Sequence, residues 1–451
     1  MHFMASLLRI IDGVILKERM GWRSVLLTFV LGAGALAAPQ QADYDQAPIR
    51  YRESVPVDPV ALLEKGIAKG GAKLAYNRSY GYLPSLLAEL HIPVSSQSLV
   101  FSKTSFQAPK INPRLPRALY FNDDAYVGWV QGSDLLEIAS VDPDLGAVFY
   151  TVPQDPAGPA RFERQTDACL QCHDSRGLTL GVPGFTVRSV YPSGDGTPHY
   201  SMGTFHTTYQ SPISERWGGW YVTGTHGKLR HLGNSTYPAE LSPDDGKRLG
   251  ERGANVTDLS SRLDIEPYLA DTSDVVALLV LEYQTYVHNL LTRANQETRL
   301  AVLQSREVNR ALGVPEDPLR EGSRARIKYA CEPLLEGLFF SGEAPLEDAV
   351  KGNSTFQADF EKRGPFDRAG RSLRQFDLAK RMFRYPLSYL VYSRSFSGLP
   401  PEAKDYLLRR MKEVLSGQDK TKPFAHLSCE DRRAILEILR DTLPEVAARL
   451  K

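Results

Sequence analysis

The order of hydrophobic and polar positions divides the chain into a part typical of strands and a later part typical of helices. Between residues 97 and 236, turn-forming residues separate short runs of aromatic and β-branched residues, which indicates β-structure. The runs that we interpret as strands are residues 99–101, 117–121, 126–130, 147–152, 185–191 and 217–223. Turns between some of them are supplied by Asn122-Asp123-Asp124 and Asp142-Pro143-Asp144.

Beyond residue 260, hydrophobic residues recur every three or four positions, which predicts helices. The longest pattern starts at Val275 and continues to Leu312, just before Gly313. Shorter patterns cover residues 324–338, 401–415 and 430–447. Ser428 and Asp431 form a capping box at the start of the last one. Residues 342–370, rich in Gly, Lys and acidic residues, are expected to form an exposed excursion.

Residues 39–96 are expected to be an extended lead-in with short helices. Polar residues and prolines fill the first part of this segment. Asp58 followed by Pro59 predicts the start of a helix that ends at residues 66–71, and residues 83–90 predict a second helix. The whole pattern predicts an α+β fold. Its parts are the lead-in, a β-rich domain over residues 97–236 and a mainly helical domain over residues 237–451.

The first 38 residues have the features of a secretory signal peptide. Met20-Gly21-Trp22-Arg23 is a short basic start, residues 25–36 are apolar, and Ala35-Leu36-Ala37-Ala38 offers small residues for cleavage. The apolar run is too short for a membrane span, and Met20 is the expected true start. An uncleaved N-terminal anchor is the alternative. The signal peptide predicts an exported, periplasmic bacterial protein with no stable membrane insertion after cleavage.

Composition and charge limit the classes of partner. The 451 residues are enough for two or three domains. Lys and Arg number 54 and Asp and Glu number 53, which gives a net charge of +1. A nearly neutral chain offers no argument for nucleic acid or an anionic membrane as partner.

One pentapeptide, Cys169-Leu170-Gln171-Cys172-His173, has the spacing that attaches a c-type haem covalently. The thiols of Cys169 and Cys172 can each form a thioether with a haem vinyl group. His173 can then serve as the proximal ligand of the iron. The sequence therefore predicts one haem c, held on a loop or a single helical turn within the β-rich region.

Over these five residues the chain resembles c-type cytochromes that carry a single haem. The β-patterned flanks look more like c-haem domains in which haem is attached to a PAS-like sheet than like all-helical class I cytochromes. Two wider segments look similar to uncharacterised exported bacterial proteins with a cytochrome c domain. These segments are Pro116-Arg117-Ala118-Leu119-Tyr120-Phe121 and Arg216-Trp217-Gly218-Gly219-Trp220-Tyr221-Val222. The second likeness implies no activity.

The sixth iron ligand decides between electron transfer and small-molecule binding. His226 is the first candidate, because it follows the strand predicted over residues 217–223 in a glycine-flanked turn. Met202 and His231 come next, followed by His288 on the long predicted helix. Each of these residues also has an ordinary interpretation, as a core-filling methionine or a core histidine.

Other residues are candidates for the surroundings of a haem. Arg188 and Arg216 could pair with the haem propionates, although an ordinary surface role is the simpler interpretation for each. Aromatic residues that could form apolar walls, but are more often plain core, are Trp129, Trp217, Trp220 and Tyr221.

The remaining cysteines, Cys331 and Cys429, leave three alternatives open. They pair as a disulfide in an oxidising compartment, or they are two free thiols. The third alternative is a zinc site that they form with Cys169 and Cys172, although the second CxxC pair usual for such sites is missing.

The function predicted first is single-electron transfer to a redox partner protein, by an electron carrier rather than an enzyme. A haem-based sensor or gas-binding protein is the alternative, and a peroxidase-like haem enzyme is the second. A zinc-stabilised structural protein without haem is the fourth hypothesis.

Overall fold

The runs rich in β-branched residues form an antiparallel sheet whose strands pair in chain order. We describe a computed structural model of the protein over residues 42–240 and 242–450. The predicted signal peptide, with Met20, lies outside these residues. The six strands of the sheet are β1 (Ser98–Val100), β2 (Arg117–Phe121), β3 (Ala125–Trp129), β4 (Leu135–Asp142), β5 (Gly146–Pro153) and β6 (Glu163–Arg164). A separate two-stranded sheet pairs β7 (Arg188–Val190) with β8 (Thr204–His206).

The strand register assigns side chains to the two faces of the large sheet. Leu119 pairs with Gly128, Gly128 with Glu137, and Glu137 with Thr151. Residues directly opposite share a face and alternate residues return to it, so Arg117 and Phe149 lie on this face as well. On the other face Tyr150 contacts the start of α1. The first of these faces carries the candidate site.

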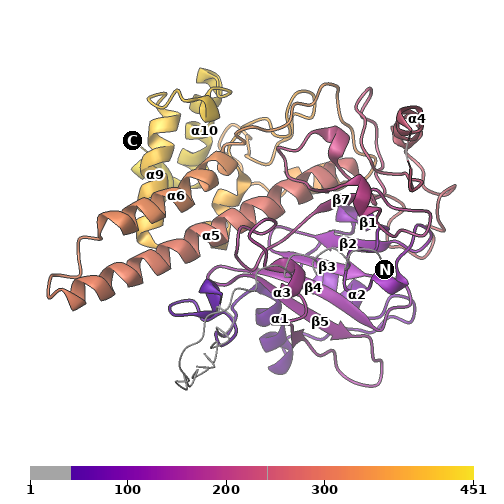
Figure 1. Cartoon of the computed structure of the whole chain (residues 1–451), viewed down its shortest axis with the longest axis horizontal. Helices are drawn as coiled ribbons and strands as arrows, with labels where there is room; N and C mark the ends of the chain where they lie inside the picture. The colour runs from indigo at the N-terminus through magenta and orange to yellow at the C-terminus, as the bar shows by residue number, and fades with distance from the viewer. Residues whose placement is uncertain (1–41, 241, 451) are drawn as a thin grey trace, which may run out of the picture. The chain divides into compact units, whose positions relative to one another are not determined.

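The helices before and after the sheet have the following bounds: α1 (Pro59–Ala68), α2 (Leu83–Glu89), α3 (Leu170–His173), α4 (Pro243–Gly253), α5 (Val275–Ala311), α6 (Glu321–Leu338), α7 (Phe356–Glu361), α8 (Arg394–Ser397), α9 (Pro401–Leu415), α10 (Cys429–Thr442) and α11 (Pro444–Arg449). Helix α5 extends from the sheet to the C-terminal helices, with α6 packed beside it (Figure 1). The architecture is therefore α+β, with the sheet in the N-terminal half and the large helices in the C-terminal half.

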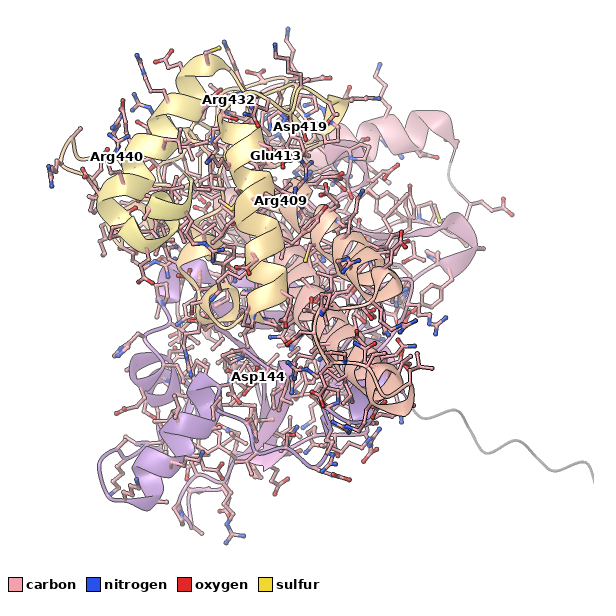
Figure 2. All side chains as sticks on the ribbon, turned by 90° about the vertical axis from the view of Figure 1, so that its left-hand side faces the viewer. Asp144, Arg409, Glu413, Asp419, Arg432 and Arg440 are labelled. Atoms are coloured by element: carbon pink, nitrogen blue, oxygen red, sulfur yellow. The ribbon has the colours of Figure 1, made fainter. Side chains whose placement is uncertain are left out.

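The described residues form one unit in which sheet and helices share a hydrophobic core. At the C-terminal end, Arg432 of α10 donates hydrogen bonds to the carbonyl groups of Val414 and Phe424 (Figure 2). These bonds connect α10 to the end of α9. Within the described part of the chain, none of the helices has the length and apolar character needed to cross a bilayer.

Sequence reasoning made two wrong assignments of structure and missed part of the sheet. Residues 217–223 do not form a strand, because Trp217 and Gly219 have φ angles of 63° and 87° and turn the chain. Strand β4 was not predicted. Residues 342–370 are not simply an exposed excursion, because α7 lies within them and buries Phe356 and Phe360 in the core.

Asp58 connects α1 to the sheet. Its Oδ1 accepts hydrogen bonds from the backbone N–H groups of Val60 and Ala61, as expected of an N-cap residue. Its Oδ2 accepts a hydrogen bond of 2.6 Å from the hydroxyl of Tyr150 on β5. The carboxylate is fully buried, so both sets of partners depend on it.

We predict that Asp58→Ala lowers the free energy of unfolding by about 2–3 kcal/mol, because it removes the cap and leaves the buried Tyr150 hydroxyl unpaired. Urea unfolding monitored by circular dichroism measures this loss. Glu64→Ala, at an exposed position of the same helix, is the control and should change the value by less than about 0.5 kcal/mol. Equal losses in the two variants would show that Asp58 has no special role.

Candidate functional site

The pentapeptide of residues 169–173 forms a single helical turn, which is one of the two alternatives that the sequence left open. The carbonyl of Cys169 accepts hydrogen bonds from the N–H groups of Cys172 and His173, and Leu170 is buried in the core. Cys169 is half-buried and Cys172 is exposed. The turn therefore places two thiols and one imidazole on a short, anchored piece of backbone.

The imidazole of His173 is oriented by the backbone of residue 184. Its Nδ1 lies 2.8 Å from the carbonyl oxygen of Gly184, which can only accept, so Nδ1 carries the hydrogen. The N–H of Gly184 donates in return to the carbonyl of His173 at 3.0 Å. This tautomer leaves the lone pair on Nε2, the arrangement in which a histidine binds a metal ion.

The ring of His173 packs against the sheet. Its centroid lies 4.7 Å from that of Phe149 on β5. Burial lowers the pKa of His173 to about 4, so the imidazole is neutral at neutral pH. Burial, with the nearby charge of Glu137, raises the pKa of Cys169 to about 11, so its thiol is protonated.

Helix α5 holds the loop before β7, whose Gly184 accepts the His173 hydrogen bond. The side-chain amide of Asn289 donates to the carbonyl of Phe185 and accepts from its N–H, both at 2.8 Å. A Cβ on Gly184 would lie 2.4 Å from the Asn289 side-chain oxygen, so only glycine permits this close approach. Asn289 thereby fixes the backbone next to the carbonyl that orients His173.

The lead-in segment contacts both ends of the motif instead of running free as an extended segment. Arg52 forms an ion pair with Asp167, two residues before Cys169. The hydroxyl of Tyr44 donates a hydrogen bond of 2.5 Å to Asp174, the residue after His173. These contacts connect the turn to the lead-in segment at both of its ends.

The structure places His226, the first candidate for a sixth ligand, in a buried pair with His231. Their Nε2 atoms lie 3.2 Å apart. His231 Nδ1 accepts from the N–H of Gly233, so its hydrogen is on Nε2. His226 Nδ1 donates to the carbonyl of Leu229, and His226 Nε2 accepts from His231 and from the N–H of Asn255. Both rings are therefore neutral and have complete sets of partners.

The other ligand candidates lie in different surroundings. Met202 is half-buried in a 3₁₀ turn before β8. His288, on α5, donates from Nε2 to the carbonyl of Asp123, and its buried Nδ1 has no hydrogen-bond partner among the described residues. Among these residues, no hydrogen bond, ion pair or ring contact joins His226 or Met202 to residues 169–173. The sixth ligand stays a prediction.

The residues expected around a haem have partners of their own. Arg216 is fully buried and pairs with Glu282 at 3.1 Å, so the surface role given as its simpler interpretation is wrong. Arg188 donates to Thr204 in the β7–β8 hairpin and lies over the ring of Tyr200. The aromatic candidates are buried in the hydrophobic core, which agrees with their interpretation as ordinary core residues. They are Trp129, Trp217, Trp220 and Tyr221.

Cys331 and Cys429 are free thiols in the structure, so they form no disulfide. Cys331 is buried on α6, and burial raises its pKa to about 12. Cys429 is exposed in the first turn of α10. The described residues contain no group of three or more His, Cys, Asp or Glu side chains that could hold a metal ion, so the four cysteines form no zinc site there.

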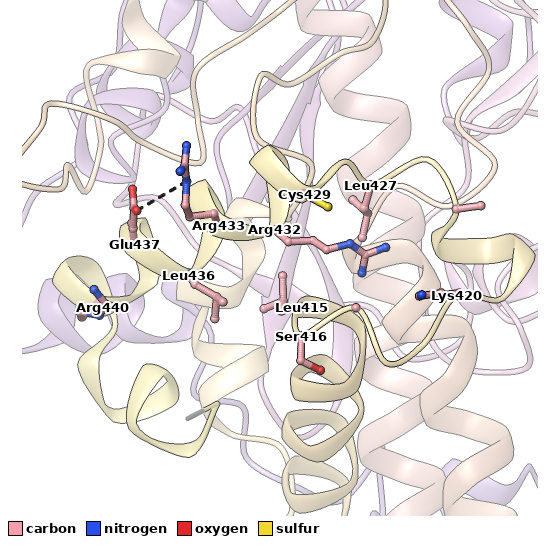
Figure 3. A pocket seen from close by; sticks show the side chains of 12 residues that line it. Leu415, Ser416, Lys420, Leu427, Cys429, Arg432, Arg433, Leu436, Glu437 and Arg440 are labelled. Atoms are coloured by element: carbon pink, nitrogen blue, oxygen red, sulfur yellow. Dashed lines mark ion pairs between the residues drawn. The ribbon is translucent and has the colours of Figure 1, made fainter.

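A cavity of about 610 Å³ lies between the end of α9 and α10 (Figure 3). Leu415, Leu427 and Leu436 give it an apolar lining, and basic side chains such as Arg433 and Arg440 surround them. Neither this cavity nor a second one of about 460 Å³ is lined by a residue of the motif. The site is therefore defined by the motif and its contacts.

Sequence reasoning missed the residues that support His173 from a distance. Asn289 is a polar residue within the hydrophobic pattern of the long helix, and such an interruption is the signal that could have found it. Phe149 was included in a predicted strand without a role. Gly184 has no local signal, because its importance arises only from the approach of α5.

Comparison with known proteins does not assign the chain to a family. No protein-family model, no curated protein and no solved structure matches the chain. The likeness to c-type cytochromes therefore depends on the residues of the motif and on their geometry.

We predict that Asn289→Leu lowers the free energy of unfolding by about 2–4 kcal/mol, because it leaves the N–H and the carbonyl of Phe185 unpaired in the core. Urea unfolding measures the loss, and ¹⁵N shifts of the imidazole are expected to show less of the Nδ1–H tautomer at His173. Asn295→Leu, which removes one α5 hydrogen bond to Pro143, is the matched control and should leave the tautomer unchanged. A His173 tautomer that is the same in both variants would contradict the role of Asn289.

We also predict a pH dependence from the pair of His226 and His231. Burial lowers the pKa of both rings, that of His231 to about 3, and the positive charge of Arg230 contributes to the shift. The neutral pair stabilises the fold fully above pH 6.5, and this stability is lost as the pH falls from 6.5 toward 3, because the unfolded chain binds protons first. For His231 alone the loss is at most about 1.4 kcal/mol per pH unit.

The measurement is the free energy of unfolding between pH 7.5 and 5. His231→Asn should be less sensitive to pH than the unchanged protein, because one proton-binding difference is removed. His91→Asn is the control, since His91 is exposed, and it should keep the original slope. An unchanged slope in the His231 variant would refute the prediction.

Proposed function

We propose that the chain is an exported c-type cytochrome that carries one haem and transfers single electrons. In this proposal Cys169 and Cys172 hold the haem through thioether bonds, and His173 is the proximal ligand of its iron. The observation that carries the proposal is the hydrogen bond from His173 Nδ1 to the carbonyl of Gly184 within a CxxCH turn. It leaves the lone pair of Nε2 free, as in a histidine that binds a metal ion while its other ring nitrogen donates to a backbone carbonyl.

The residues present fit a covalently bound haem. The two thiols and the histidine lie on one helical turn. Nδ1 of the histidine already has a hydrogen-bond partner, so Nε2 is free to bind the iron. The half-buried Ala139 on β4 lies directly opposite Phe149, so it shares the apolar face of the sheet that carries the motif. When bound, the haem supplies a one-electron iron couple.

The protein's own contribution is to hold the ligand still. Asn289 fixes the backbone at residues 184–185, Phe149 supports the ring of His173, and Tyr44 anchors the end of the turn through Asp174. A ligand held on three sides keeps its geometry when the oxidation state changes, which favours a carrier over a site that must rearrange.

Exposure of the motif supports electron transfer in particular. Gln171 and Cys172 are exposed, whereas Leu170 is buried. A group bonded to Cys172 would have its attached edge near solvent, where a redox partner protein can approach. The periplasmic location, the redox partner and the PAS-like character of the sheet belong to this proposal, and the near-neutral charge gives no reason to add nucleic acid.

The test is mass analysis of the chain after production in a bacterium that matures c-type haem in its periplasm. We expect the peptide that contains residues 169–173 to carry the mass of one haem. Cys169→Ser with Cys172→Ser should abolish the attachment, because no sulfur is left to form a thioether. Cys331→Ser with Cys429→Ser is the matched control and should keep it.

Absorption spectra then separate a carrier from the alternatives. A reduced α-band with low-spin iron that does not bind carbon monoxide supports electron transfer. High-spin ferrous iron that binds carbon monoxide readily would favour a sensor or an enzyme instead. A purified protein with no Soret band and no added mass on this peptide would refute the haem altogether.

A further inference from the structure

An ion pair lies across the face of the sheet that carries the motif. Nη2 of Arg117 on β2 lies 2.7 Å from Oε2 of Glu137 on β4, so the pair spans β3. The two side chains are only 20% and 15% exposed. Gly128 on β3 makes room for them, because a Cβ at this position would lie 2.3 Å from the Arg117 guanidinium.

The register places this pair next to His173. Glu137 lies opposite Thr151, and Phe149 lies two residues from Thr151 on the same face. Glu137 and Phe149 are therefore diagonal neighbours, about 7–8 Å apart. Because the ring of Phe149 lies against His173, the ion pair and the imidazole share one region of the face.

The pair is not satisfied within the described part of the chain. The Nε of Arg117 and the Oε1 of Glu137 are both buried, and neither has a hydrogen-bond partner there. Buried polar atoms in folded proteins normally have partners, so each exception needs an explanation. A partly buried ion pair is also weak evidence for stability, because its desolvation offsets its attraction.

We propose that Arg117 and Glu137 set the reduction potential of the group bound by Cys169, Cys172 and His173. The inference rests on the proposed function, because it requires the haem. An oxidised iron centre carries one more positive charge than the reduced one, so the cation of Arg117 favours the reduced state and the carboxylate of Glu137 the oxidised state. Solvent screens charges only weakly at a partly buried site, so each of these two charges acts on the group bound at the neighbouring motif.

The experiment measures the midpoint potential of the haem-loaded full-length protein by spectroelectrochemistry at pH 7.5. Arg117→Gln should lower the potential and Glu137→Gln should raise it, and the double variant should return close to the original value. A purely structural role would move both single variants in the same direction or would change only their unfolding. Arg117→Lys keeps the charge and should stay near the original potential, which preserves the test if Arg117→Gln does not fold.

The matched control is the ion pair of Arg326 and Glu297 between α6 and α5, which is of similar length and somewhat more exposed. Arg326→Gln and Glu297→Gln should leave the potential unchanged. Haem attached at residues 169–173 together with shifts that are absent, or equal in sign, overturns the role of the ion pair and leaves the proposed function standing. A peptide without haem overturns both proposals.

Discussion

Polar side chains on α5 pair with the backbone of the loops at one end of the sheet, and the arrangement of the site depends on these hydrogen bonds. Gln284 and His288 donate to the carbonyl groups of Asn122 and Asp123 in the β2–β3 turn. Asn295 and Gln296 donate to carbonyl groups in the β4–β5 turn. Backbone groups removed from water need partners. The long helix supplies them from its own side chains, so the turns can pack tightly against it.

The same constraint reaches the motif through Asn289. This residue is buried on α5, where a polar side chain is tolerated because both of its amide atoms bond Phe185. The carbonyl of Gly184 is fixed as a consequence, and it determines which nitrogen of His173 carries the hydrogen. The tautomer at the site is thus decided by a helix more than one hundred residues away in the sequence.

Features that depend on residues close in sequence were predicted correctly, whereas features that depend on distant residues were missed. Strand β2 and helix α9 have the predicted bounds, because the pattern of nearby residues determines them. The error at residues 217–223 arose because Trp217 and Gly219 adopt positive φ angles, which a strand cannot accommodate, although the composition of the segment is typical of strands. The motif and its helical turn were predictable from five residues. Gly184 and the pairing of Arg117 with Glu137 were not, because they depend on strand register and on the approach of α5.

The combination of rigidity and exposure at the motif is what the proposed electron transfer would require. A carrier needs a ligand that does not move and an edge that a partner can reach, since electron transfer makes no bond to the partner. The double hydrogen bond between His173 and Gly184 meets the first need, and the exposed Cys172 meets the second. A sensor would instead need a mobile element coupled to the ligand. Here the lead-in contacts at Asp167 and Asp174 connect both ends of the turn to the rest of the fold.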